Sequence, residues 1–384
     1  MLRVAVNPEL LRWARERSGL AQQDLAARSR LGKLPEWESG RTKPTLKQVE
    51  AFADAVRVPV GYLFLETPPE EEAPIPDFRT VGGQPMRRPG PDLLETIRIC
   101  QERQGWYREY ARAAGQPELA FVGSATVDMP PEAAAARMRN ALDFDIRSRR
   151  ACPTWTEALR LFVRCADEAG ILVMVSGVVG SNNNRRLDPA EFRGFALADP
   201  LAPLVFVNGS DAKAAQMFTL AHELAHVWLG ADALSNMDAA PATGFRREEV
   251  WCNAVAAELL VPGDALQAEM QAGEVTLETV QRLARIFKVS SPVVLRRLLD
   301  IGRLDRAAFD ILWAGELQRF GDSPGSRGGN FYNTTFARVS RRFARALIAN
   351  TLEGETLYRD AFRMLGVSGT ETFNNLGRKV GILE

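Results

Sequence analysis

The most constraining feature of this 384-residue sequence is the position of its two histidines, which both lie in one five-residue run. The run is His222-Glu223-Leu224-Ala225-His226. On an α-helix, side chains at positions i and i+4 lie on one face, so both imidazoles can reach one metal ion. The glutamate between them is then placed to accept a proton from a metal-activated water. The spacing predicts a helix that carries most of a zinc hydrolase site, with Glu223 as the catalytic residue.

The flanking residues favour this interpretation over two histidines on an ordinary helix. Residues 204–208 are apolar and rich in β-branched side chains, which is typical of a strand. Residues 209–211 predict a turn and a helix N-cap. Residues 212–229 lack glycine and proline and repeat apolar residues at helical spacing, which predicts the histidine helix. A strand, a short turn and a metal-binding helix suit a zinc peptidase, because an edge strand can hold an extended peptide by backbone pairing.

Composition limits the other classes of function. The length predicts roughly two or three domains, and the formal net charge of zero gives the whole chain no bias towards nucleic acid. The four cysteines have no paired spacing, which argues against a disulfide framework and is typical of a reducing compartment. No segment resembles a signal peptide or a membrane span. We therefore expect a cytoplasmic protein with no membrane partner.

The pattern of elements predicts a mainly α fold with a small β-sheet, an α+β class, in four parts. Residues 1–66 predict a unit of five short helices. Residues 67–92 contain seven prolines and predict an extended linker, in which residues 77–79 are a candidate anchor. Residues 93–300 contain the histidine helix and a small predicted sheet with strands at 171–175, 192–197 and 204–208. Residues 301–384 form a helical C-terminal region.

The missing third metal ligand must be a carboxylate or a cysteine, because catalytic zinc sites usually take three protein ligands and no histidine remains. The helix predicted at 246–260 offers four candidates: Glu248, Glu249, Cys252 and Glu258. Glu249 has Asn253 one turn later, which is placed to hold its carboxylate from the second shell of the site. Alternatively, Glu248 and Glu249 only form an acidic helix N-terminus, which the helix dipole favours.

Two blocks resemble the ImmA/IrrE family of metallo-endopeptidases, over roughly residues 150–300. The first block is FTLAHELAH, from Phe218 to His226, and the second is EVWCNAVAAELLVP, from Glu249 to Pro262. The second block is similar to the family pattern Glu-x-x-Ala-Asn-x-Phe-Ala-Ala-x-Leu-Leu-x-Pro, with a cysteine and a valine as departures. The resemblance implies a zincin-like peptidase domain, with Zn²⁺ held by His222, His226 and Glu249.

The N-terminal unit resembles the helix-turn-helix domain of phage-repressor-like (XRE-type) regulators. The resemblance is carried by residues 22–26 and 37–44, and it implies that residues 32–38 are the recognition helix for DNA. Within residues 1–66, eleven Lys and Arg minus eight Asp and Glu give a net charge of +3. The candidate DNA contacts are Gln22, Lys33, Arg41 and Lys43.

Two features of the basic regions leave alternatives open. Pro35 reduces the backbone donors of the recognition helix, so the N-terminal unit could instead serve protein contacts only. Near the C-terminus, four arginines at positions i, i+3, i+4 and i+7 predict one basic helix face, which either contacts DNA or an acidic partner or is simply solvated. These are Arg338, Arg341, Arg342 and Arg345.

The combined sequence features lead to one functional hypothesis and one alternative. The resemblance implies a DNA-associated zinc endopeptidase that cleaves a protein regulator such as a repressor. The alternative is a transcriptional regulator or antitoxin that binds DNA and a partner protein, such as a toxin, without proteolysis. In either case a homodimer is a reasonable expectation, because repressor-like domains commonly bind DNA as dimers.

Overall fold

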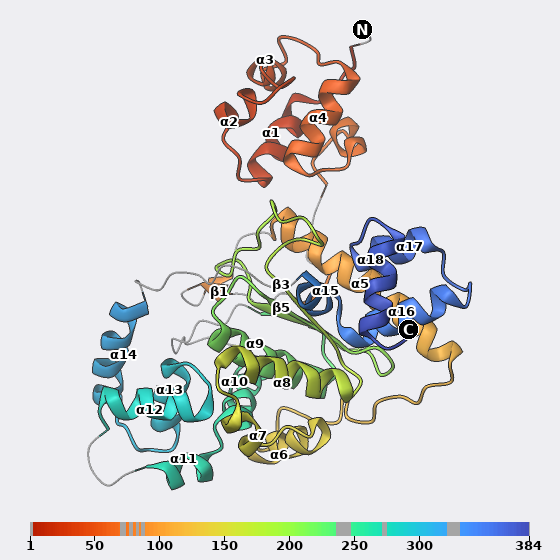
Figure 1. The fold of residues 1–384 in the computed structure, drawn as a ribbon. Coiled ribbons are helices and arrows are strands. Elements are labelled where there is room, and N and C mark those ends of the chain that lie inside the picture. Colours follow the sequence, from red (N-terminus) through yellow and green to blue (C-terminus); the bar gives the residue numbers. More distant parts are fainter. Residues whose placement is uncertain are drawn as a thin grey trace. The chain divides into compact units, whose positions relative to one another are not determined.

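Figure 1 shows the fold in a computed structural model, which divides into two compact units. One unit is Met1–Pro74 with Arg87–Glu95, and the other is Ile75–Met86 with Thr96–Glu384. The structure describes residues 3–69, 74–76, 80–81, 84–85, 89–235, 247–270, 275–320 and 331–383. The candidate anchor at 77–79 therefore lies outside the described residues.

The N-terminal unit consists of four α-helices and a short 3-10 helix. They are α1 (Pro8–Arg17), α2 (Gln22–Ala26), α3 (Leu34–Glu38), α4 (Leu46–Val56) and η1 (Val60–Phe64). α1 begins after Asn7, whose side chain accepts from the Glu9 N–H, and α4 begins with a capping box between Thr45 and Gln48. Apolar side chains from these helices form a separate core. The expected five short helices are therefore present, the last one as a 3-10 helix.

A small mixed sheet lies at the centre of the larger unit. Its strands are β3 (Leu172–Ser176), β4 (Gly194–Leu197), β5 (Leu204–Asn208) and β6 (Ala233–Ser235), in the order β3-β5-β4-β6. β3 and β5 are parallel, whereas β4 is antiparallel to both of its neighbours. β5 is thus an inner strand and β6 an edge strand. The sequence prediction found the first three strands but missed β6, which has only three residues and no β-branched side chain.

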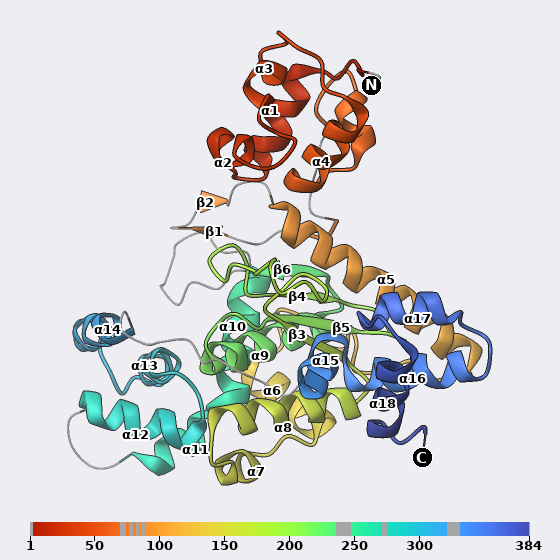
Figure 2. The same ribbon diagram turned by 45° about the horizontal axis from the view of Figure 1, so that its top comes forward.

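Helices surround this sheet (Figures 1 and 2). In chain order, the first of these helices are α5 (Pro91–Ala113), α6 (Pro131–Leu142), α7 (Ile146–Ala151), α8 (Trp155–Glu168), α9 (Lys213–Leu229) and α10 (Arg247–Leu260). The strands β1 (Thr80–Val81) and β2 (Gln84–Pro85) have two residues each and pair with one another. The later helices are α11 (Gly263–Glu269), α12 (Leu277–Phe287), α13 (Ser291–Asp300), α14 (Arg306–Phe320), α15 (Phe331–Val339), α16 (Arg341–Leu352), α17 (Tyr358–Leu365) and α18 (Thr370–Lys379). The predicted α+β class is confirmed.

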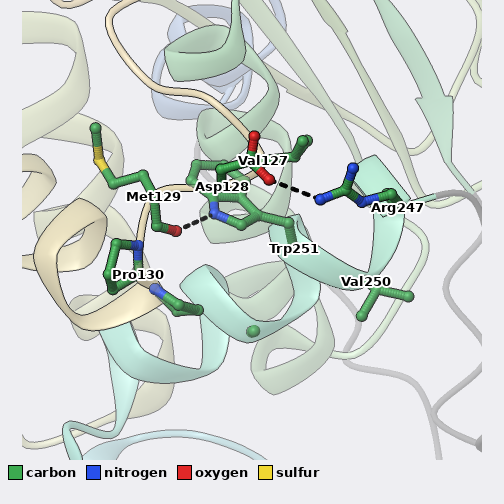
Figure 3. Close-up of a pocket in the computed structure, with 9 residues that line it drawn as sticks. Val127, Asp128, Met129, Pro130, Arg247, Val250 and Trp251 are labelled. Atoms are coloured by element: carbon green, nitrogen blue, oxygen red, sulfur yellow. Dashed lines mark hydrogen bonds and ion pairs between the residues drawn. The ribbon is translucent and has the colours of Figure 1, made fainter.

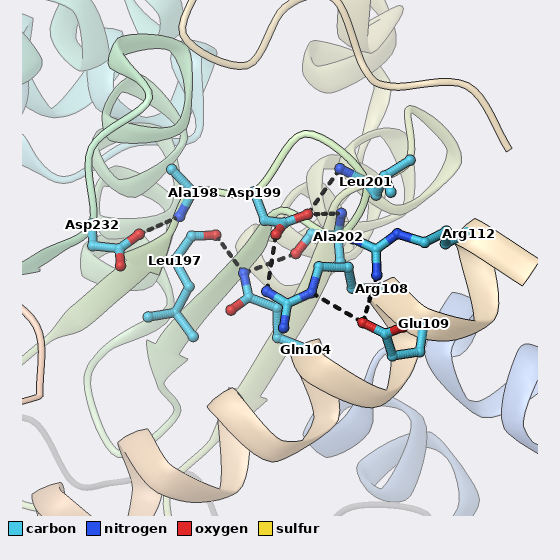
Figure 4. Close-up of polar contacts among 10 residues, drawn as sticks. All are labelled: Gln104, Arg108, Glu109, Arg112, Leu197, Ala198, Asp199, Leu201, Ala202 and Asp232. Carbon is cyan, nitrogen blue, oxygen red and sulfur yellow. Dashed lines mark hydrogen bonds and ion pairs between the residues drawn. The ribbon is translucent and has the colours of Figure 1, made fainter.

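Polar contacts fasten α5 to the turn after β4 (Figure 4). The Gln104 side-chain amide donates to the carbonyls of Leu197 and Ala202, each at 3.0 Å. Asp199 accepts from the backbone N–H of Ala202 at 2.9 Å and forms an ion pair with Arg108 at 3.3 Å. The long helix therefore supports the end of β4 that lies away from Gly194. Among the described residues, every helix is too short or too polar to cross a bilayer.

The predicted single basic face near the C-terminus is wrong. Ser340 has a positive φ of 67° and separates α15, which carries Arg338, from α16, which carries the other three arginines. Arg342 is also committed within the fold, because its Nε donates to the Tyr107 hydroxyl and its backbone N–H donates to Asp167. The regular spacing of the arginines does not produce one surface, because the helix is interrupted between them.

Candidate metal centre

The histidine helix α9 is buried along nearly its whole length. It packs between α8 and α10 and against β4 and β5, which explains why apolar or small side chains occur on several of its faces. We expected its N-cap within residues 209–211, but the N-cap is Ala212, with no side-chain cap. Instead, the Gln216 side chain donates to the carbonyls of Gly209 and Asp211. α9 ends at Gly230, whose φ of 70° is a left-handed C-cap.

A glycine lets β4 approach the centre of α9. A Cβ added to Gly194 would lie 2.7 Å from Cγ2 of Thr219, 2.9 Å from the carbonyl oxygen of Phe206 and 3.0 Å from Cγ of Glu223. Real Cβ atoms do not come so close, so a side chain at this position would push the strand away from the helix. Gly194 therefore sets the distance between the sheet and Glu223.

Three buried side chains from α9 and α10 converge on one point. His222 Nε2 and His226 Nε2 lie 3.1 Å apart, and they lie 3.3 and 3.0 Å from the two carboxylate oxygens of Glu249. Both histidines have 0% exposure and Glu249 has 5%. Within the described part of the chain, this trio is the group of His, Cys, Asp and Glu side chains whose ligand atoms all lie close together, within 4.8 Å.

The spacing and chemistry of these donors fit a zinc ion. Ligand atoms about 2.0–2.1 Å from a tetrahedral ion are roughly 3.3 Å apart, which is close to the three observed distances of 3.0 to 3.3 Å. Imidazole nitrogen and carboxylate oxygen are also ligands that zinc prefers. The residues His222, His226 and Glu249, expected as ligands, are thus the residues that the fold brings together.

Protonation of the cluster also suits a metal. Burial raises the pKa of the Glu249 carboxyl, but the two adjacent imidazoles outweigh burial, so the net pKa lies below its usual range. Burial lowers the pKa of the His226 imidazole, which keeps it neutral near pH 7. An ionised carboxylate beside a neutral imidazole is the form in which both groups bind a cation.

The expected catalytic residue Glu223 lies at the centre of the helix with 0% exposure. It follows His222 directly in the chain and lies against Gly194 of β4. Glu223 thus lies next to the ligand cluster in the chain and against the inner strand β4 of the sheet.

Asn253 supports the cluster in a different way from the one expected. We expected its side chain to hold the Glu249 carboxylate, but its Oδ1 lies 3.1 Å from Nδ1 of His222. An amide oxygen at this distance suits the tautomer with its proton on Nδ1, in which Nε2 faces Glu249. The asparagine therefore orients a histidine ligand rather than the carboxylate.

The structure separates the other ligand candidates from this cluster. Glu248 and Cys252 are not members of it. Burial raises the pKa of the Cys252 thiol well above its usual value, and the nearby carboxylates of Glu249 and Glu223 raise it further, so the thiol stays protonated. Glu258 instead forms a buried ion pair with Arg297 of α13.

A cavity of about 420 Å³ lies beside another face of α10 (Figure 3). The Trp251 indole N–H donates to the Met129 carbonyl at 2.7 Å, and Arg247 pairs with Asp128 at 2.7 Å. The remaining lining residues are mainly apolar, and none belongs to the ligand cluster. The cavity is therefore distinct from the metal centre, although the same helix lines both.

The four DNA-contact candidates have different surroundings in the N-terminal unit. Gln22 is half-buried, and its side-chain amide donates to the buried Glu38 carboxylate at 2.7 Å. Lys33, Arg41 and Lys43 are exposed, and Arg41 Nε donates to the Ser39 hydroxyl. The three cations are thus open to an anion, whereas Gln22 takes part in the packing of the unit.

Comparison with known families gives two matches. Residues 166–299 match a peptidase family model described as the IrrE N-terminal-like domain. This segment runs from the end of α8 to α13 and includes the whole ligand cluster. Residues 339–379 match a domain of unknown function, DUF8813, and no curated protein matches the chain. The first match supports the resemblance to ImmA/IrrE peptidases. Neither model covers the N-terminal unit, whose helix-turn-helix interpretation stays a prediction.

Sequence reasoning missed two parts of the site. Gly194 was noted only as part of a strand, although a glycine before an apolar strand facing a helix is a signal for close packing. The edge strand β6 was missed because its three residues carry no periodic signal. Both parts are defined by their contacts: β6 pairs with β4, and Gly194 of β4 packs against α9.

Proposed function

We propose that this protein is a cytoplasmic zinc endopeptidase that cleaves a protein regulator, such as a repressor, and that its N-terminal unit binds DNA. The observation that carries the proposal is the cluster of His222, His226 and Glu249 donors, 3.0 to 3.3 Å apart, beside buried Glu223. Its position within the segment that matches a peptidase family supports the same reaction.

In the proposed mechanism, a zinc ion held by the three ligands would supply a Lewis acid that polarises a peptide carbonyl and lowers the pKa of water. Glu223 accepts the proton of the attacking water and then gives it to the leaving amine. Asn253 keeps the His222 ring in the required orientation. The chain has no further histidine to stabilise an oxyanion, so this role falls to a donor of another kind.

The test compares the wild-type protein with Glu223→Gln and with Glu248→Gln as a matched control. The proteins encoded by the adjacent reading frames serve as substrates, and zinc per chain is measured by mass spectrometry. We expect all three proteins to hold zinc. Cleavage should be at least about 100-fold slower in the Glu223 variant only, because the proton acceptor is lost.

Two outcomes would overturn this function. One is cleavage by Glu223→Gln at the wild-type rate. The other is a stable, uncleaved complex of the wild-type protein with a neighbouring gene product, unchanged by Glu223→Gln, which would identify the regulator or antitoxin function instead.

A further inference from the structure

The outer edge of the central sheet is in contact with the proline-rich segment of the same chain. The backbone N–H of Leu234 in β6 donates to the carbonyl oxygen of Pro76 at 3.0 Å. The preceding residue, Ile75, is only 5% exposed. Both residues belong to the unit that contains the sheet. Residues 75 and 76 therefore lie beside β6, where one backbone hydrogen bond joins Pro76 to Leu234 and the Ile75 side chain is buried.

β6 is the strand next to β4, which contacts Glu223. In the sheet register, Ser235 pairs with Gly194 and Leu234 pairs with Phe195. Gly194 is the residue whose added Cβ would lie 3.0 Å from Cγ of Glu223. Leu234 is thus the neighbour in the chain of Ser235, which pairs with Gly194. A strand added to the outer edge of β6 would lie about 4.8 Å from β6, on the side away from β4. An extended peptide that reaches Glu223 by strand addition would use this edge.

The chemistry of the segment makes its hold on the edge weak. Pro76 has a carbonyl that accepts a hydrogen bond but no N–H to return one. A peptide that has an N–H at this position can form an additional backbone hydrogen bond. Such a peptide gains roughly 0.5–1.5 kcal/mol over the segment, about 2- to 13-fold in affinity, and displaces it once its concentration outweighs the effective concentration of the tethered segment.

We propose that residues 75 and 76 are an internal competitor for peptide binding at the outer edge of β6. The partner of this edge is an extended peptide with an apolar side chain and an available backbone N–H. Substrate binds in place of the segment, so the linker lowers the activity of the resting protein. The consequence for cleavage rests on the proposed peptidase function, whereas the competition for the edge does not.

The experiment uses the full chain with Ile75→Asp, which charges the buried anchor, and with Ile311→Asp as a matched control, because Ile311 is 73% exposed. Both changes are made in a Glu223→Gln background to prevent self-cleavage. Exchange of the Leu234 amide is measured, together with binding of a fluorescent synthetic peptide that has the sequence of residues 67–81. If thermal unfolding shows that Ile75→Asp does not fold, Ile75→Ala replaces it.

We expect the Leu234 amide to exchange at least about tenfold faster in the Ile75 variant than in the other two proteins. The peptide should bind this variant at least about tenfold more tightly, because the tethered competitor has a high effective concentration in the others. Equal exchange and equal peptide binding in all three proteins would overturn the proposal.

A separate measurement distinguishes this proposal from the proposed function. The same Ile75 change with Glu223 intact is tested for digestion of the proteins encoded by the adjacent reading frames. Faster digestion than by the wild type supports both proposals. No digestion by either protein, with the expected changes in exchange and binding, would reject the peptidase function and keep the competitor.

Discussion

The α9–α10 pair and the N-terminal unit both contain buried polar residues, but they satisfy them differently. In the pair, two imidazoles and the Glu249 carboxylate bring their ligand atoms within 4.8 Å of one another. In the N-terminal unit, the Glu38 carboxylate is 4% exposed and is held by Arg15 at 2.8 Å and by Gln22. A buried group of electron-pair donors indicates a bound cation, whereas a carboxylate paired with arginine indicates a fold contact.

The largest test of this difference is removal of the carboxylate from the ligand cluster. Glu249→Gln should lower zinc affinity by at least about 100-fold, since even a residue that only orients a ligand contributes 10- to 100-fold. Affinity is measured by competition with a fluorescent chelator. The neighbouring change Glu248→Gln, which removes the same charge, should leave affinity within about twofold. Equal losses in both variants would show that the site responds only to total charge.

The corresponding change in the N-terminal unit should affect stability rather than ligand binding. Glu38→Ala leaves Arg15 without its main partner, whose hydrogen bond raises the arginine pKa. We expect a loss of about 2–3 kcal/mol in the free energy of unfolding of this unit, below the cost of a fully buried pair because Arg15 keeps some solvent contact. Hydrogen exchange of the buried α1 and α4 amides measures this loss.

Glu16→Ala provides the control for this change, because Glu16 also contacts Arg15, at 3.4 Å, but is largely exposed. Its removal should cost no more than about 0.5 kcal/mol. If the two variants were equally stable, the buried contact between Glu38 and Arg15 would not stabilise the unit more than the exposed contact of Glu16.

A third change tests whether close packing, in addition to the ligands, defines the metal region. Gly194→Ala would force β4 away from Thr219 and Glu223, and we expect it to destabilise the larger unit by about 1–3 kcal/mol. Gly105→Ala in α5 is the matched control, because no atom lies within 4 Å of its added Cβ. That change should be neutral or stabilise the protein by up to about 1 kcal/mol. Urea unfolding measures both; a stable Gly194→Ala protein would contradict the packing argument.

These contrasts also explain which parts of the molecule were predictable from sequence. The histidine helix, the helix of Glu249 and three strands were predicted because periodicity and short-range spacing determine them. The partner of Asn253 and the break at Ser340 depend on contacts between distant segments, and these predictions failed. The predicted start of α9 failed for a local reason, because the Gln216 side chain replaces the expected N-cap. The edge strand was missed because its identity comes from its partner β4 rather than from its own residues.

The smallest expected effect concerns DNA binding by the N-terminal unit, where exposed cations rather than buried donors would act. If Lys43 contacts a phosphate, Lys43→Ala should weaken binding to a random DNA duplex by a few-fold and lower the slope of log affinity against log salt concentration by about 1. Lys47 of α4 is also exposed and was not expected to contact DNA, so Lys47→Ala removes the same charge as a control. Fluorescence anisotropy at several salt concentrations measures the slope. Equal slopes for the two variants would mean that only net charge attracts DNA, and an absence of binding by the wild type would leave the unit as a protein-contact module.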